Sequence, residues 1–172
     1  EFDMPGHATA VCRAYPEVSG GGEGRWKHFT FHPCKAETYD FIENILDELF
    51  QLFPSPYIHI GGDEVSTTAD YLNEMIAYVE SKGKKCELWN PINGIGQDAL
   101  NHSLAQMWGT RGYLASGKAN IDSRYNYTNH FDVFADLVGI YKSNIYYESK
   151  GNPTVAGAIS GCWNDRKMES VT

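Results

Sequence analysis

The chain of 172 residues alternates amphipathic helical stretches with short apolar runs. In residues 42–53 the apolar side chains recur every three or four positions, which is one face of a helix, and prolines 54 and 56 should end it. A β-rich run at residues 57–60 follows at once. Strands that alternate with helices in this way are typical of parallel sheets joined by crossover helices.

The same pattern continues along the rest of the chain. Helices are predicted at residues 72–79 and 131–141, and Thr67 with Asp70 resembles a capping box before the first of them. Residues 16–33 are rich in glycine and proline and predict one long loop. The other predicted strands are residues 1–3, 86–89, 104–108, 119–122 and 155–159.

Every predicted strand is followed by polar or aromatic residues. These ends lie at residues 3–7, 63–64, 89–90, 106–108, 125–127 and 163–165. In (β/α) barrels the active site is built from the C-terminal ends of the strands. The sequence therefore predicts an α/β fold, a (β/α)8 TIM barrel whose top face is a pocket of carboxylates and tryptophans. Six strand candidates fall short of the eight in a closed barrel, so we expect an incomplete barrel of about strands 3 to 8, as one domain over residues 1–172.

Composition excludes several other classes of protein. The chain has 14 Lys and Arg against 22 Asp and Glu, for a formal net charge of −8. Nucleic acids and anionic membranes bind basic surfaces, so we expect neither as a partner. No apolar run approaches the roughly 20 residues of a membrane span, and no charged-then-apolar leader opens the chain.

The four cysteines, at positions 12, 34, 86 and 162, form no CxxC pair, which argues against a zinc ribbon. Four cysteines allow three disulfide pairings, and the sequence does not choose among them. We expect the cysteines to be buried as small apolar residues.

The segment His59-Ile60-Gly61-Gly62-Asp63-Glu64 concentrates the chemistry. Neighbouring side chains on a regular strand point to opposite faces, but two glycines let the chain leave that pleating so that both acids can turn to one pocket. Paired carboxylates in unlike environments supply an acid and a stabilising base at one pH. Two alternatives stay open: a solvated Asp-Glu at a helix start, and a metal site using His59 and Asp63.

Residues 57–65 resemble the signature of the family 20 glycoside hydrolases, the β-N-acetylhexosaminidases. Residues 1–7 resemble that family's preceding strand-end motif, about 56 residues upstream. Trp89, Trp108 and the run 163–165 follow in the family's order, so the resemblance covers essentially the whole chain.

The resemblance implies a retaining, substrate-assisted hydrolysis that releases terminal β-linked N-acetylglucosamine or N-acetylgalactosamine from a glycan through an oxazolinium ion. Glu64 would be the general acid and then the base, with its pKa raised by an apolar wall and by Asp63. Asp63 would orient the acetamide N–H. No cofactor and no metal is implied, and the glycans concerned lie outside the cytoplasm.

The resemblance also implies roles for other residues. Trp89, Trp108 and Trp163 would wall the sugar pocket, although core packing is the usual role of a single Trp. Tyr127 would donate its hydroxyl to the acetamide oxygen, and Asp165 would bind sugar hydroxyls. Asp3, His7 and His59 would support the acid, and a purely structural role for the histidines stays open.

Three departures from the family pattern are visible. The family's Tyr-x-Asp stands here as Tyr127-Thr128-Asn129, with Tyr125 as a competing candidate. Asp165 stands where the family usually has Glu. The arginine of the family's first strand is missing, so other chain segments would have to supply the rest of the barrel. A carbohydrate-binding or inactive form of the domain, and a metal-dependent (β/α) hydrolase, stay open as alternatives.

Overall fold

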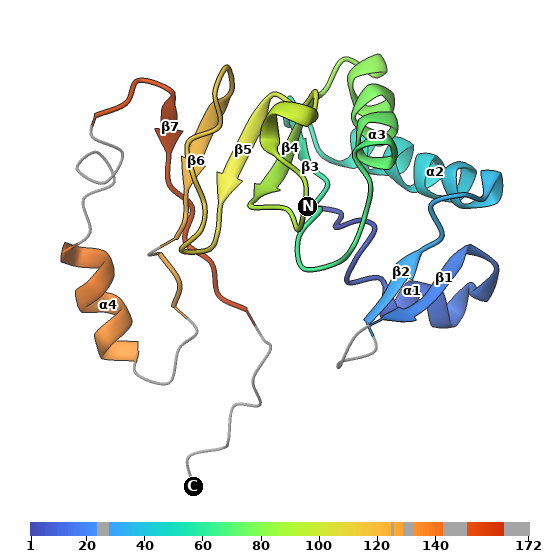
Figure 1. The fold of residues 1–172 in the computed structure, drawn as a ribbon, viewed down its shortest axis with the longest axis horizontal. Coiled ribbons are helices and arrows are strands. Elements are labelled where there is room, and N and C mark those ends of the chain that lie inside the picture. Colours follow the sequence, from blue (N-terminus) through green and yellow to red (C-terminus); the bar gives the residue numbers. More distant parts are fainter. Residues whose placement is uncertain (24–27, 125, 129–132, 143–150, 164–172) are drawn as a thin grey trace, which may run out of the picture.

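The computed structural model describes residues 1–23, 28–124, 126–128, 133–142 and 151–163 (Figure 1). Its helices and strands alternate along most of the chain, as the sequence predicts. In order they are α1 (Thr9–Ala14), the 3-10 turn η1 (Pro16–Val18), β1 (Ser19–Glu23), β2 (His28–Phe31), α2 (Ala36–Leu52), β3 (Tyr57–His59), α3 (Ala69–Ser81), β4 (Lys85–Asn90), η2 (Gln97–Ala99), β5 (Leu104–Met107), β6 (Ala119–Asp122), α4 (Val133–Lys142) and β7 (Val155–Gly157).

The main sheet has five strands in the order β3-β4-β5-β6-β7, and every neighbouring pair is parallel. The N-terminal segment extends its first edge. Phe2 N–H donates to the His59 carbonyl and Met4 N–H to the Ile60 carbonyl, and Met4 forms a parallel bridge with Gly61. The predicted first strand is thus present as a single bridge. Successive parallel strands that neighbour one another in chain order confirm the predicted partial barrel.

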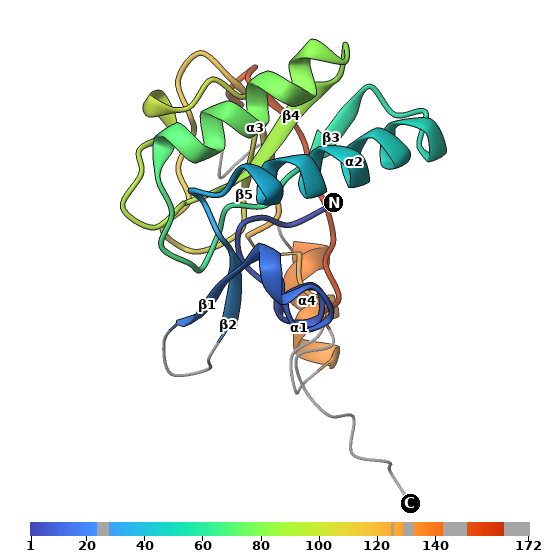
Figure 2. The same ribbon diagram turned by 90° about the vertical axis from the view of Figure 1, so that its right-hand side faces the viewer.

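Helices α2 and α3 lie side by side over one face of the sheet (Figure 2). Their apolar stripes bury Ile42, Leu46, Leu72 and Ile76, each 0% exposed, against the sheet. Helix α2 ends one residue before Phe53, ahead of the prolines that were predicted to stop it. This face of the sheet is therefore covered at its β3–β4 end, and the strand ends remain free to carry polar side chains.

The capping prediction for α3 was wrong by one residue. Thr68, and not Thr67, is the N-cap, and its hydroxyl accepts the Tyr71 N–H at 3.2 Å. The backbone of Thr68 is extended, as a capping residue requires, so the helix begins at Ala69. The predicted glycine at the far end is confirmed, because Gly83 follows the helix with a φ of +74°.

The prediction of one loop over residues 16–33 was wrong, because most of this segment forms the antiparallel β1–β2 hairpin. The glycines of this segment are not typical of strands, so the sequence pattern did not indicate them. Gly20 lies so close to β2 that a Cβ there would sit 3.2 Å from the Phe31 carbonyl oxygen. The Phe31 side chain is 1% exposed, and its N–H donates to the Pro5 carbonyl, which ties the hairpin to the N-terminal segment. Helix α1 was not predicted either.

All four cysteines are free. Cys12 and Cys86 are buried, as favoured, whereas Cys34 and Cys162 are exposed and depart from that prediction. The predicted helix at 131–141 is present as α4 from Val133 onward, while residues 131 and 132 lie outside the described part. Within the described residues, the helices are too short or too polar to cross a membrane.

Candidate active site

The glycine pair after β3 sets the geometry of the two acids. Gly61 and Gly62 have φ values of +75° and +96°, and Glu64 itself has +56°. Such angles take the chain out of regular strand pleating. A Cβ on Gly61 would lie 1.6 Å from Asp3 Oδ1, so only glycine lets Asp3 pack here. Gly62 N–H donates to the same oxygen at 3.2 Å.

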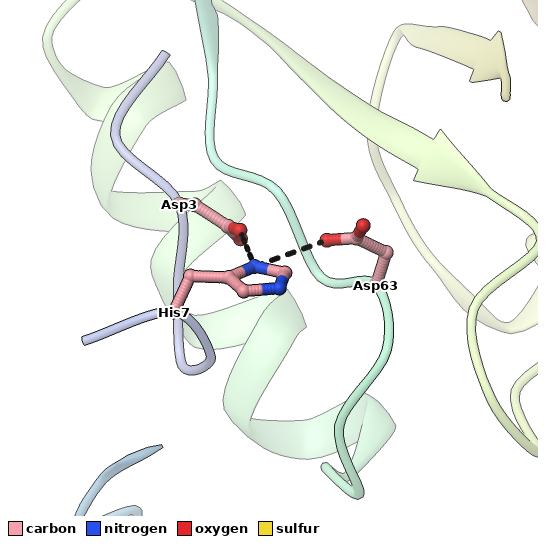
Figure 3. Close-up of side chains that lie close together, drawn as sticks. All are labelled: Asp3, His7 and Asp63. Carbon is pink, nitrogen blue, oxygen red and sulfur yellow. Dashed lines mark hydrogen bonds and ion pairs between the residues drawn. The ribbon is translucent and has the colours of Figure 1, made fainter. Parts of the chain in front are cut away.

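His7 gathers the acids around one imidazole (Figure 3). Its Nδ1 is hydrogen-bonded to Asp3 and lies 3.8 Å from Asp63 Oδ1, while its Nε2 lies 3.2 Å from Glu64 Oε2. The hydrogen bond to Asp3 raises the pKa of His7 to about 9, aided by the charge of Asp63 and opposed by burial. His7 is therefore an imidazolium at neutral pH. Asp63 and Glu64 therefore both lie beside this imidazole.

Asp63 and Glu64 differ in environment. Asp63 is 9% exposed, and burial, followed by the charge of Asp3, raises its pKa to about 7. Its Oδ1 is buried and has no hydrogen-bond partner among the described residues. The Glu64 side chain is 54% exposed, so the apolar wall expected around it is not supplied by the described residues. The pair thus consists of one buried acid and one accessible acid.

A pocket of about 330 Å³ opens at the strand ends beside this cluster. Trp89, Tyr127 and Trp163, three of the residues proposed for the sugar pocket, line it together, and His59 also lines it. The Trp89 and Trp163 rings meet edge to face with centroids 6.1 Å apart. Asp63, Glu64 and Trp108 do not line this pocket. The charges of Asp63 and Glu64 nevertheless add to the burial that raises the pKa of Tyr127, so the acids lie within electrostatic reach of that wall.

A hydrogen bond joins Tyr127 to Trp108 beside the pocket. The Tyr127 hydroxyl donates to the Trp108 carbonyl at 2.9 Å, and the Trp108 indole N–H donates to the Pro91 carbonyl at 3.0 Å. The predicted acetamide donor therefore already has an acceptor in this structure.

His59 is a buried residue at the end of β3. Burial lowers its pKa to about 3, so it is neutral, and its Nδ1 accepts the Gly61 N–H at 3.0 Å. Its ring packs on Trp89 with centroids 4.5 Å apart. His59 thus fixes the turn before the acids and the tryptophan beside them. Asp165 lies outside the described residues, as do Tyr125 and Asn129.

The sequence reasoning missed several polar side chains that line the pocket. Glu87 is 8% exposed, and burial raises its pKa to about 7 with help from the charge of Glu1. Glu1 accepts the Trp89 indole N–H at 2.8 Å. The alternation of side chains along a strand could have identified Glu87 as a pocket residue, because Glu87 stands two residues before Trp89 and shares its face. The remaining polar lining residues include Gln106 and Ser123.

Asp3, His7 and Asp63 are also the group within the described residues whose ligand atoms lie close enough to hold a metal ion, within 4.8 Å of one another. An imidazolium donates hydrogen bonds and cannot ligate a cation. With the pKa of His7 at about 9, its Nδ1 carries a proton at neutral pH and is hydrogen-bonded to Asp3. Of the predicted metal pair, His59 and Asp63, only Asp63 belongs to this group.

Comparison with known proteins gives a consistent result. A family model described as "Glycosyl hydrolase family 20, catalytic domain" matches residues 1–71. The chain is 24% identical over 182 residues to a beta-hexosaminidase A of Caenorhabditis briggsae, which covers 95% of this chain and 31% of that protein. It is 32% identical over 105 residues to a beta-N-acetylhexosaminidase of Cellulomonas fimi, covering 54% of this chain and 21% of that protein.

Two solved structures match nearly all of the chain. A beta-N-acetylhexosaminidase from Bacteroides fragilis NCTC 9343 has a TM-score of 0.73 at 25% identity, covering 95% of this chain and 41% of that one. A GH20 beta-N-acetylhexosaminidase from Streptomyces coelicolor A3(2) has a TM-score of 0.76 at 24% identity, covering 98% and 41%. The chain spans well under half the length of these proteins.

Proposed function

The chain belongs to glycosyl hydrolase family 20, and we propose that the protein containing it hydrolyses terminal β-linked N-acetylhexosamine from glycans. Residues 1–172 form part of its catalytic domain. The reaction retains the anomeric configuration and uses the 2-acetamido group of the substrate as the nucleophile, a route known among glycosidases.

One observation carries the proposal: adjacent acids of unlike environment share one imidazolium. Asp63 is buried with a raised pKa, while Glu64 is half exposed. Carboxylates whose environments differ in this way divide the roles of acid and stabilising base between them. The imidazolium of His7, 3.2 Å from Glu64, holds the accessible acid in place.

The reaction then follows from where these groups lie. The acetamide oxygen bonds to the anomeric carbon as the bond to the leaving oxygen breaks, and Glu64 gives that oxygen its proton. Asp63 Oδ1, which pairs with the His7 imidazolium at 3.8 Å but accepts no hydrogen bond from the described residues, accepts the acetamide N–H and stabilises the positive charge of the oxazolinium. Glu64, now a carboxylate, takes a proton from the water that opens the oxazolinium.

Substrate binding also favours the ionised form of Asp63. An N–H that donates to Asp63 stabilises its carboxylate, against the burial that raises its pKa. Trp89 and Trp163 offer their faces to the sugar, and the Tyr127 hydroxyl exchanges the Trp108 carbonyl for the acetamide oxygen.

The proposed partner is a glycan or oligosaccharide that ends in N-acetylglucosamine or N-acetylgalactosamine. A closed barrel has eight strands, so the rest of the same barrel is a second partner of the five-stranded sheet. We infer a location outside the cytoplasm, because glycans of this kind lie there.

The acetamide itself provides the test. The complete protein should cleave 4-nitrophenyl N-acetyl-β-glucosaminide or N-acetyl-β-galactosaminide at least about 10³-fold faster than the matching β-glucoside, which lacks the internal nucleophile. Treatment with a chelator should leave this rate unchanged. Equal cleavage of the glucoside would refute acetamide assistance, and N-acetylglucosamine binding without turnover would favour a binding module.

A further inference from the structure

Trp89 and Trp108 stand at the ends of neighbouring strands, and each is tied to the loop that follows β4. The Gln97 side-chain amide donates to the Trp89 carbonyl at 3.1 Å. The Trp108 backbone N–H donates to the Asn90 carbonyl at 3.1 Å, and its indole N–H to the Pro91 carbonyl at 3.0 Å. The positions of the two tryptophans therefore depend on how the loops after β4 and after β5 fit together.

Tyr113, in the loop after β5, joins the two loops through two of its atoms. Its carbonyl accepts the side-chain amide of Asn90, which is 0% exposed. Its hydroxyl accepts the backbone N–H of Gln97, 1% exposed, at 3.0 Å. Both donors are buried, and a buried N–H that loses its partner is costly. The Tyr113 ring is 46% exposed, so core burial does not account for its place.

The loop that carries Tyr113 is shaped for this close approach. A Cβ on Gly112 would lie 3.0 Å from the Asn90 carbonyl oxygen, 3.0 Å from the Gly109 carbonyl oxygen and 3.0 Å from Met107 Cβ. Each contact is tighter than a side chain normally accepts, so glycine lets the loop lie against the end of β4. From the segment after β6, the Arg124 guanidinium donates to the Gly112 carbonyl at 3.3 Å and so holds the loop from its other side.

We propose that Tyr113 is a positioning residue of the sugar pocket, a latch that fixes the spacing of Trp89 and Trp108. This rests on the proposed function, in which Trp89 touches the sugar. Trp89 contacts the sugar before and during the reaction alike, and the latch touches neither Asp63 nor Glu64. Its loss therefore weakens binding and leaves the chemical step unchanged.

Tyr113→Phe in the complete protein tests the latch, because it removes only the hydroxyl. One lost hydrogen bond corresponds to about a 3- to 10-fold rise in KM for the chromogenic N-acetylhexosaminide, with kcat within about twofold. Tyr15→Phe is the matched control, since Tyr15 is 48% exposed and packs on Phe41 with centroids 5.0 Å apart. Gly112→Ala, which pushes the loop outward, should raise KM in the same direction.

An unchanged KM in both Tyr113→Phe and Gly112→Ala would overturn the proposal, as would a loss confined to kcat. Hydrogen exchange keeps the test separate from the enzymatic assignment. In Tyr113→Phe, amides at residues 96–100 and 108–113 should exchange faster, with β4 and β5 unchanged. If the wild-type protein turns over none of the sugars, the proposed function is wrong. If hydrogen exchange in Tyr113→Phe is the same as in the wild type, the proposed latch is wrong.

Discussion

At the scale of single residues, the protonation of Asp63 controls the proposed chemistry. Burial and the charge of Asp3 raise the pKa of Asp63 to about 7. The pKa of His7, at about 9, keeps an imidazolium beside Asp63 and Glu64 well above that pH. Below about pH 7 Asp63 is therefore mostly protonated in the free enzyme, and above it the ionised form that accepts the acetamide N–H prevails.

This arrangement predicts the pH dependence of kcat/KM. As the pH falls through about 7, kcat/KM of the complete protein should fall, because the free enzyme protonates the Asp63 carboxylate that accepts the acetamide N–H and stabilises the oxazolinium. In Asp63→Asn this limb near pH 7 should disappear along with most of the activity. A profile that stays flat down to pH 5, or an identical limb in Asp63→Asn, would contradict the assignment.

The close packing at Gly61 leads to a second prediction at the residue scale, which concerns stability. Gly61→Ala should lower the free energy of unfolding by at least about 4 kcal/mol, because the new Cβ would overlap Asp3 as well as adopt a positive φ. Gly83→Ala is the control: its φ is +74° but the space around it is open, so it should cost only about 1–2 kcal/mol. Urea denaturation measures both. Equal costs would show that the packing of Asp3 against this turn does not matter.

At the scale of helices and strands, the start of α3 fixes the loop that follows the two acids. Thr68→Ala should destabilise the protein by about 1 kcal/mol, since the Tyr71 N–H loses its acceptor. Thr67→Ala should change stability by less than about 0.5 kcal/mol, because the Thr67 hydroxyl has no hydrogen-bond partner among the described residues. Thermal denaturation of the two variants side by side checks this, and the reverse order would restore the capping box expected from the sequence.

The elements that the sequence predicted well are those with strong periodicity. Helices α2 and α3 and the parallel strands follow from apolar spacing and from the prolines and glycines at their ends. The β1–β2 hairpin was missed because Gly20 and its neighbours are required by close packing against β2, which no local propensity reveals. Position 68 was missed because two adjacent threonines offer the same capping chemistry.

The residues of the candidate site also fall into those that the sequence predicted and those that it missed. Asp63, Glu64, Trp89 and Trp163 were proposed from motif and order, since chemistry restricts those residue types. Glu87 and Tyr113 were missed because their significance depends on which strand and which loop lie beside them. The raised pKa of Asp63 likewise depends on burial and on Asp3, which lies 60 residues earlier in the chain.

At the scale of the whole molecule, the described sheet is open. One edge ends at β7, and the other carries the short N-terminal bridge at Met4. The pocket is lined by Glu87 and His59 from the inner face of this sheet as well as by the tryptophans. An exposed strand edge is a template for wrong pairing. The account therefore requires the rest of the barrel, and activity is expected of the complete protein and not of residues 1–172 alone.

The most direct test of the account compares the complete protein with its Glu64→Gln variant on 4-nitrophenyl N-acetyl-β-glucosaminide and N-acetyl-β-galactosaminide. Glutamine keeps the shape of the side chain and cannot give up a proton, so kcat should fall by about 10²- to 10⁴-fold while N-acetylglucosamine still binds. Turnover by Glu64→Gln at the wild-type rate, from a correctly folded protein, would contradict the central claim that Glu64 is the general acid.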